Sequence, residues 1–453
     1  MKIVLPEKVN TVLRMLTEHG YEAYAVGGCV RDALLGRTAE DWDITTSASP
    51  YEVKTLFRRT VDTGIRHGTV TVLLDKEGFE VTTYRVDGEY EDGRHPKEVQ
   101  FTKQLSEDLR RRDFTINAMA YYEESGLVDL FGGEEDLKNR IIRCVGEPGE
   151  RFDEDALRIL RAFRFSAQLD FRIEEATLTA ASVRAENLRK ISAERIRTEL
   201  DKLLLSEHPD RLLTVYEAGI TRVIFPEFDA MMRTTQNNRN HVADVGTHTL
   251  RTVSRVGSTG EWSKRELRIL RWSALLHDVA KPECQRKHPD GSEDFPQHAA
   301  RSAQLAKKIL LRLKFDRETM DMVTRLIAAH DEYCVTWDEE QMRRMLCRFG
   351  PELLRLLFAL QEADVMAQSD WKREEKLSGL SKAEQLYRRI TQRGDCICLK
   401  QLAITGNDLL RLGFAPGKGI GEELSRLLEE VLITPTKNTK EVLTELAEWH
   451  LQE

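Results

Sequence analysis

The pattern of apolar residues changes once along this chain of 453 residues, near residue 150. Before that point, β-type runs such as residues 69–74 and 79–85 alternate with helical spacing, as at residues 5–20. From residue 153 to about residue 449, nearly every periodic segment has helical spacing. We therefore expect an α+β fold, in which a small α/β head precedes a long all-helical remainder.

Size and composition narrow the class of protein. The chain is too long for one hydrophobic core and suggests two to four domains. Its net charge of −8 argues against a broad nucleic-acid-binding surface but allows a local basic groove. No stretch has the apolar length of a signal peptide or a membrane span. Seven cysteines without a CxxC pair favour a cytoplasmic protein with reduced thiols.

A glycine pair, Gly27 and Gly28, is followed closely by Asp41 and Asp43. Glycines that open a helix allow backbone N–H groups to approach a phosphate. Residues two apart in an extended segment face the same side, and two such carboxylates can hold the Mg²⁺ ions of a nucleoside triphosphate. The alternative is a glycine-rich turn followed by a solvated acidic loop. The glycines at this distance from the aspartates favour the catalytic interpretation.

Two later segments can complete such a site. Glu80 lies among β-forming residues, and a strand beside the aspartates would make it a third metal ligand; a solvated glutamate is the alternative. Residues 110–117 contain three arginines followed by Asp113. Arginine forks suit triphosphate oxygens, and Asp113 could accept hydrogen bonds from ribose hydroxyls. A solvated charge cluster is the alternative here.

Glu154, Asp155 and Arg158 are spaced to share one face of a helix, where they could form an ordinary ion pair. A sharper hypothesis is base reading, because cytosine and adenine both present an amino donor beside a ring-nitrogen acceptor. Asp155 can accept from the amino group while Arg158 donates to the ring nitrogen. Uracil and guanine present the opposite pattern and would leave buried charges unpaired, so this pair would select C and A without a template.

The helical part contains a series of histidines and aspartates. The series comprises His248, His277, Asp278, His298, His330 and Asp364. Most single helical histidines are structural or solvated, but an adjacent His-Asp pair after an apolar run is more specific. Imidazole and carboxylate together suit Mn²⁺, Ni²⁺, Fe²⁺ or Mg²⁺, so we expect a second metal site within residues 240–365.

The first 200 residues resemble the class II tRNA nucleotidyltransferase/poly(A) polymerase family, and within it the bacterial CCA-adding enzymes. The matching motifs are Gly27-Gly28 with Arg31-Asp32 and Asp41-Trp42-Asp43, then Arg111-Arg112-Asp113, Glu154-Asp155 with Arg158, and Ser192-Ala193-Glu194-Arg195-Ile196 with Glu199. Residues 92–101 are similar to the flexible loop that the full CCA-adding members use when they switch to adenine. The histidine series resembles an HD-type phosphohydrolase domain.

The resemblance implies roles for the matched residues. Asp41 and Asp43 would bind two Mg²⁺ ions, one activating the tRNA 3′-hydroxyl and the other neutralising the triphosphate and pyrophosphate. Glu80 would be the third carboxylate. The implied nucleotide-binding set is Gly27, Gly28, Arg31, Arg111, Arg112, Asp113, Asn117, Glu154, Asp155, Arg158 and Arg161.

For the HD-type domain, the resemblance implies two groups of metal ligands. The first ion would be held by His248, His277, Asp278 and Asp364, and a second ion by His298 and His330. Such domains accompany some CCA-adding enzymes, where phosphatase or cyclic-phosphodiesterase activity can result.

The expected organisation has four parts. They are a nucleotidyltransferase head at 1–145, a helical neck and body at 146–235, an HD-type domain at 236–370 and a helical tRNA-binding tail at 371–453. A glycine-rich turn in the tail, with Lys418 at its tip, could approach a nucleic-acid backbone or simply join two helices.

The expected function is addition of CCA to the 3′ end of tRNA from CTP and ATP, by a monomer or weak dimer with no membrane partner. Within the same class, the alternatives are an A-only or CC-only enzyme and a poly(A) polymerase; the intact loop at 92–101 argues against CC-only addition. From another class, the alternative is a metal phosphohydrolase acting on tRNA ends or nucleotides.

Overall fold

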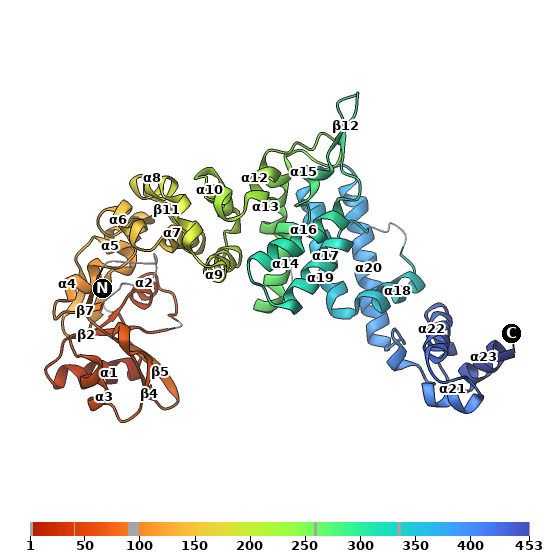
Figure 1. Cartoon of the computed structure of the whole chain (residues 1–453), viewed down its shortest axis with the longest axis horizontal. Coiled ribbons are helices and arrows are strands. Elements are labelled where there is room, and N and C mark those ends of the chain that lie inside the picture. The colour runs from red at the N-terminus through yellow and green to blue at the C-terminus, as the bar shows by residue number, and fades with distance from the viewer. Residues whose placement is uncertain (1–2, 40, 89–98, 258–260, 333–336, 453) are drawn as a thin grey trace. The chain divides into compact units, whose positions relative to one another are not determined.

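The computed structural model describes all residues except 1–2, 40, 89–98, 258–260, 333–336 and 453 (Figure 1). The chain divides into two compact units, Met1–Asp229 and Ala230–Glu453. The expected α+β class is confirmed, because strands and helices mix in the first unit and helices dominate the second. The loop expected at 92–101 falls largely outside the described residues. None of the described helices combines the length and apolarity needed to cross a membrane.

The first unit is built on a described sheet of seven strands in the order β3-β4-β5-β2-β1-β8-β9. Its strands are β1 (Ala23–Val26), β2 (Ile44–Thr46), β3 (Thr60–Gly64), β4 (Thr69–Leu74), β5 (Glu77–Thr83), β8 (Met119–Tyr122) and β9 (Gly126–Asp129). Strands β2 and β5 run parallel, with Ile44 opposite Val81. Asp43 and Glu80 each precede a paired residue by one position, so this register sets Asp43, just before β2, beside Glu80 in the middle of β5.

Strands β4 and β5 form the hairpin expected from the sequence. They pair from Thr69 with Thr82 to Leu74 with Glu77. The two residues between them, Asp75 and Lys76, both have positive φ angles, 46° and 72°. Two-residue turns of this kind match the twist of the strands that they join, and they fix the strand register.

The first unit also contains eleven described helices, of which α1, α2 and α3 contact strands of this sheet. They are α1 (Glu7–Glu18), α2 (Gly28–Leu34), α3 (Pro50–Leu56), α4 (Leu105–Arg110), α5 (Gly133–Asn139), α6 (Pro148–Glu154), α7 (Leu157–Leu169), α8 (Glu175–Val183), α9 (Ala193–Leu204), α10 (Leu212–Glu217) and α11 (Thr221–Ile224). Short strand pairs accompany them: β6 (Arg85–Asp87) with β7 (Val99–Phe101), and β10 (Ile141–Ile142) with β11 (Arg172–Ile173).

One expectation about these helices is wrong. Glu154, Asp155 and Arg158 do not lie on one continuous helix, because α6 ends at Glu154 and α7 begins at Leu157. Asp155 between them is extended, with φ −138° and ψ 102°. Its Oδ1 accepts a hydrogen bond from the Leu157 N–H at 3.0 Å. Aspartate side chains favour such local bonds to backbone N–H groups over the helix interior, which accounts for the break.

The second unit is helical, and α12 (Pro226–Met232) spans the boundary between the units. Its further helices are α13 (Val245–Arg255), α14 (Lys264–Leu276), α15 (Lys281–Cys284), α16 (His298–Arg312), α17 (Arg317–Ala329), α18 (Glu339–Phe349), α19 (Pro351–Ala367), α20 (Arg373–Arg393), α21 (Gly406–Leu412), α22 (Lys418–Ile433) and α23 (Lys440–Gln452). A small hairpin joins β12 (Arg286–Lys287) to β13 (Glu293–Asp294). Helices α21 to α23 enclose an apolar cluster of their own, which includes Leu409, Leu427 and Leu443.

Candidate nucleotidyl-transfer site and metal centre

Three carboxylates gather beside the sheet of the first unit. Asp41 and Asp43 lie in the segment just before β2, not within a strand as the spacing suggested. Both line a cavity of about 590 Å³ together with Gly28 and Arg31, and both also line a cavity of about 900 Å³ together with Glu80. Two aspartates from one segment and a glutamate from the adjacent strand therefore meet at the junction of two cavities.

The charges of these carboxylates act on one another. Desolvation raises the pKa of Glu80 above its ordinary value, and the negative charges of Asp43 and Asp41 raise it further. Desolvation also raises the pKa of Asp43; Arg112 opposes this shift and Asp41 adds to it. Carboxylate oxygens that repel one another in this way are suitable ligands for a hard divalent cation such as Mg²⁺. The residues present therefore fit the metal ions that the sequence predicts.

The glycine turn lies against one of the predicted arginines. Gly27 has a φ of +84°, and a Cβ atom there would lie 2.9 Å from Nη1 of Arg112. The positive φ disfavours any side chain, and the arginine reaches the turn because glycine has none. Arg111 has a different position: it donates to Oδ1 of the buried Asp108 at 2.7 Å, and Arg112 Nη2 lies 3.4 Å from Oδ2 of the same residue.

A buried polar network joins the remaining predicted nucleotide-binding residues. Arg31 donates to Oδ1 of Asn117 at 2.7 Å, and the Asn117 amide donates to Oδ1 of Asp113 at 3.1 Å. Arg161 Nε donates to Oδ2 of Asp113 at 2.7 Å. Burial alone would raise the pKa of Asp113, but Arg161 and Asn117 hold it well below its usual range.

This network bears on the expected ribose contact. Asp113 Oδ2 is contacted by Nε and Nη2 of Arg161, and Oδ1 accepts hydrogen bonds from the Asn117 amide and, at 2.9 Å, from the backbone N–H of Phe114. The four acceptor positions of the carboxylate are therefore engaged within the protein. A ribose hydroxyl could donate to Asp113 only by replacing one of these bonds. In the structure, Asp113 holds Arg161 directly and is linked to Arg31 through Asn117.

The candidate base-reading residues are held by different partners. Asp155 Oδ2 accepts a hydrogen bond from Nη2 of Arg195 on α9 at 2.8 Å. Arg158 Nη1 lies 2.5 Å from Oε2 of Glu154, and its Nη2 donates to the backbone carbonyl of Arg111 at 2.9 Å. The expected Glu154–Arg158 pair is therefore present. The partner of Asp155, in contrast, comes from a helix forty residues later, so spacing alone could not identify it.

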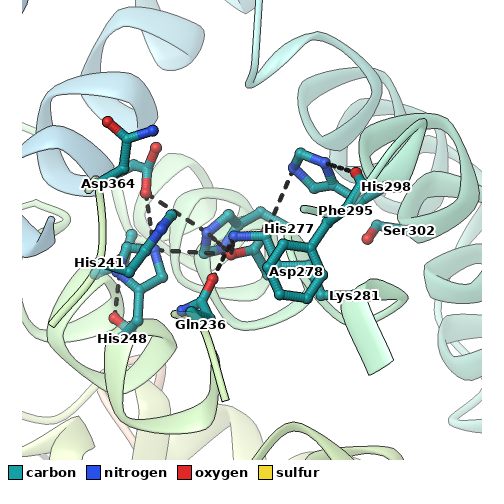
Figure 2. A network of polar contacts seen from close by, with 12 residues as sticks. Gln236, His241, His248, His277, Asp278, Lys281, Phe295, His298, Ser302 and Asp364 are labelled. Carbon is teal, nitrogen blue, oxygen red and sulfur yellow. Dashed lines mark hydrogen bonds and ion pairs between the residues drawn. The ribbon is translucent and has the colours of Figure 1, made fainter. Parts of the chain in front are cut away.

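The second unit brings together all six predicted ligands of the HD-type site. Figure 2 labels five of them: His248, His277, Asp278, His298 and Asp364. Potential ligand atoms of His248, His277 and Asp278 lie within 4.8 Å of one another, and so do those of Asp278, His298 and His330. Asp364 Oδ1 lies 2.9 Å from Nε2 of His248. The ligands come from α13, from the ends of α14 and α17, from the start of α16, and from α19, so five helices converge on one point.

Three of these histidines share one orientation. Nδ1 of His277, His298 and His330 each contacts the backbone carbonyl three residues earlier, at 2.8, 3.0 and 2.7 Å. A carbonyl can only accept, so each Nδ1 carries a proton, and Nε2 is the ring nitrogen left to ligate a metal. Fixing the outer ring nitrogen in this way is how proteins orient imidazoles that ligate metals.

Charge and burial also fit a metal ion at this point. Among the described residues, buried atoms of His248, His277 and Asp278 have no hydrogen-bond partner, and their close contacts are charged groups of the same cluster. Burial would raise the pKa of Asp278, but His277 and Lys281 hold it well below its usual range. Desolvation lowers the pKa of His330 to about 3, so this imidazole is neutral. Carboxylate oxygens beside imidazole nitrogens are the donor set of a transition-metal site.

Two residues of this site were not predicted. Lys281 Nζ lies 2.7 Å from Oδ2 of Asp278 and donates to Oε1 of Gln236 at 2.7 Å. Its position three residues after Asp278 is a spacing that the sequence could have revealed. His241 contacts the ring of His248 edge-on, with 4.9 Å between the ring centroids. It lies in a loop, where no periodicity marks it.

Comparisons with known proteins find related families for segments of both units. The family described as the poly A polymerase head domain matches residues 23–143, a probable RNA and SrmB-binding site of polymerase A matches 170–232, and a putative tRNA nucleotidyltransferase domain 2 matches 297–447. The chain is 54% identical over 203 residues to the CCA-adding enzyme of Limosilactobacillus reuteri, a match that spans 45% of this chain and 50% of that protein.

Two further matches extend over nearly the whole chain. The CCA-adding enzyme of Enterococcus faecalis is 36% identical over 445 residues, which is 96% of this chain and 94% of that protein. The crystal structure of the Bacillus stearothermophilus CCA-adding enzyme in complex with CTP matches with a TM-score of 0.74 and 28% identity, covering 99% of this chain and 98% of that one. Together with the sheet-borne carboxylates and the motifs beside them, these matches show that the chain belongs to the CCA-adding enzymes of the class II nucleotidyltransferase family.

Proposed function

We propose that this protein adds C, C and A to the 3′ end of tRNA, using CTP and ATP and releasing pyrophosphate. The observation that carries the proposal is the parallel pairing of β2 with β5, which sets Asp43 beside Glu80 with Asp41 close by. Mg²⁺ ions held by these carboxylates would supply charge neutralisation for the triphosphate and activation of the tRNA hydroxyl.

The chain's own residues would do the positioning. Arg112 beside the glycine turn and Arg31 on α2 supply cationic donors next to the carboxylates, where triphosphate oxygens would lie. Asp155 and Arg158 would read the amino group and the ring nitrogen of C or A. The Arg195 contact orients Asp155, and the backbone contact to Arg111 orients Arg158, so the two readers are held before a base arrives.

The decisive experiment is nucleotide addition to a tRNA that ends immediately before its CCA. Labelled CTP and ATP are supplied singly and together, and the products are separated by length. Addition of three nucleotides with both substrates supports the proposal. Two added cytidines, one added adenosine, or a long adenosine tail would instead identify the CC-only enzyme, the A-only enzyme or the poly(A) polymerase.

Arg158→Ala should relax base selection more than it weakens triphosphate binding. The arginine is the donor that matches C and A, and losing it removes the mismatch penalty against UTP and GTP, about 1–3 kcal/mol per unsatisfied buried group. We expect discrimination, measured as the ratio of kcat/KM values for CTP and UTP, to fall by about tenfold or more. The exposed Arg189→Ala, on the same unit, is the matched control. Unchanged discrimination would contradict the base-reading role.

We also propose that the second unit is a metal-dependent phosphohydrolase. The specific observation in its favour is Asp278, whose carboxylate is common to both groups of potential ligands. Mn²⁺, Ni²⁺, Fe²⁺ or Mg²⁺ would supply a polarised phosphate and an activated water there. Its substrates would be phosphate esters of tRNA ends or nucleotides. The test is metal content and hydrolysis of p-nitrophenyl phosphate by the full chain; no bound metal and no hydrolysis would contradict this second function.

We also propose the four-part organisation that the sequence predicts: head 1–145, neck and body 146–235, HD-type domain 236–370 and tRNA-binding tail 371–453. In the tail, Lys418 begins α22 directly after the glycine-rich turn, and its side chain is 92% exposed. An exposed cation at this turn suits contact with a nucleic-acid backbone.

A further inference from the structure

A lysine from outside the ligand set lies at the cavity that opens onto the HD-type cluster. The cavity, of about 670 Å³, is lined by Asp278, His330 and Asp364 and also by Lys376 from α20. The Lys376 Nζ donates to Oε1 of Gln368 at 2.6 Å, and the Gln368 amide donates to Oδ2 of Asp364 at 2.9 Å. One glutamine side chain therefore separates this cation from a predicted metal ligand.

The surroundings of Lys376 do not satisfy its charge. Its contacts are the neutral oxygens of Gln368 and, at 3.4 Å, of Asn240. Burial lowers the pKa of Lys376, although Asp364 and Asp331 act in the opposite direction. Amide oxygens hold the ammonium in place without neutralising it, so an anion entering the cavity would find it available.

Besides its burial, the position of Lys376 in its helix also disfavours its positive charge. α20 begins at Arg373, so Lys376 lies in the first turn, where the N-terminal end of the helix dipole disfavours cations. Its neighbours Glu374 and Glu375 follow the usual preference for acidic residues there. The fold thus holds a half-buried cation where both desolvation and the dipole oppose it. A bound anion would reverse both effects, because it interacts favourably with the ammonium and with the helix terminus alike.

We propose that Lys376 binds the phosphate group of the substrate at the HD-type site, with Gln368 as its positioning residue. This inference rests on the proposed phosphohydrolase function and specifies how that site recognises its substrate. The contact is with the phosphate, not with the leaving group. Lys376 should therefore matter equally for a small ester such as p-nitrophenyl phosphate and for a tRNA that carries a terminal 3′-phosphate.

The test compares the full chain with Lys376→Gln and Lys376→Arg, each loaded with Mn²⁺. Isothermal titration with inorganic phosphate should show about tenfold weaker binding for the glutamine variant and near-normal binding for the arginine variant, because a charge-assisted hydrogen bond is lost in one and kept in the other. For p-nitrophenyl phosphate, KM should rise more than kcat falls. Lys382→Gln, on the exposed part of the same helix, is the matched control.

The outcomes separate the two proposals. Metal content should be the same in all variants. If the unmodified chain binds no metal, that result would contradict the phosphohydrolase function itself. If the unmodified chain binds metal but not phosphate, or if Lys376→Gln binds phosphate as tightly as Lys382→Gln does, the role of Lys376 is overturned while the metal site stands. A rate loss for the tRNA 3′-phosphate but not for p-nitrophenyl phosphate would place Lys376 on the nucleic acid and also overturn the proposal.

Discussion

Replacing Asp43 with asparagine should reduce nucleotide addition to tRNA by about 1,000-fold or more. Asparagine keeps the shape of the side chain, but its neutral oxygen is a poor ligand for a hard divalent cation. Metal stabilisation of the transferring phosphoryl group is worth several kcal/mol, and about 1.4 kcal/mol corresponds to a factor of ten in rate. The measurement is single-turnover incorporation of labelled CMP into tRNA lacking its CCA.

The control for this variant is Asp62→Asn, which changes an exposed aspartate on β3 of the same sheet. It should leave addition within about twofold of the unmodified chain. Both variants should keep the metal content and any phosphohydrolase activity of the second unit. Substantial addition by Asp43→Asn at saturating Mg²⁺ would show that this carboxylate is not a metal ligand.

Replacing Asp278 with asparagine should remove metal from the second unit and abolish its hydrolysis of phosphate esters. Asp278 is common to both ligand groups, so its loss affects both ions. We expect metal affinity to fall by at least about 100-fold, because even outer partners of metal ligands contribute about 10- to 100-fold. Metal content after dialysis, measured by mass spectrometry, tests this directly.

Two further variants separate ligation from folding. Asp278→Asn leaves the buried Lys281 without its carboxylate, so thermal unfolding must be measured alongside. His330→Gln removes a ligand of the second group only and should lower the number of ions bound by the second unit from two to one. The exposed Asp321→Asn should change neither number. Retention of both ions by Asp278→Asn would refute the proposed centre, and tRNA addition should survive in all three variants.

The sequence predicts the features of this protein that depend on short stretches of chain. The hairpin of β4 and β5, the glycine turn before α2 and the carboxylates near β2 all follow from neighbouring residues whose backbone preferences act locally. The His-Asp pair at residues 277 and 278 is evident for the same reason. Asp155 shows where sequence spacing fails as a guide to helices. Its position relative to Arg158 fits a helix, but its side chain accepts a hydrogen bond from the Leu157 N–H, and α6 ends before it while α7 begins after it.

The site residues that the sequence did not predict depend on contacts between distant segments of the chain. Arg195 of α9 contacts Asp155, and Lys376 of α20 lines the cavity and contacts Gln368. His241 lies in a loop beside His248. Lys376 and His241 have no periodic or spacing signal, and the motif that contains Arg195 does not identify Asp155 as its partner, because tertiary packing of separate helices determines these neighbours.

The two-residue turn at Asp75 and Lys76 has a consequence for how this protein can vary. Its length sets the register of β5 and therefore the side of the sheet on which Glu80 lies. An inserted residue that shifted the pairing of β5 by one position would turn Glu80 to the opposite face, away from Asp43. Evolution can exchange the two turn residues for others that adopt positive φ, but insertions and deletions there should be absent from active relatives. Engineered grafts should likewise treat this hairpin as an element of fixed length.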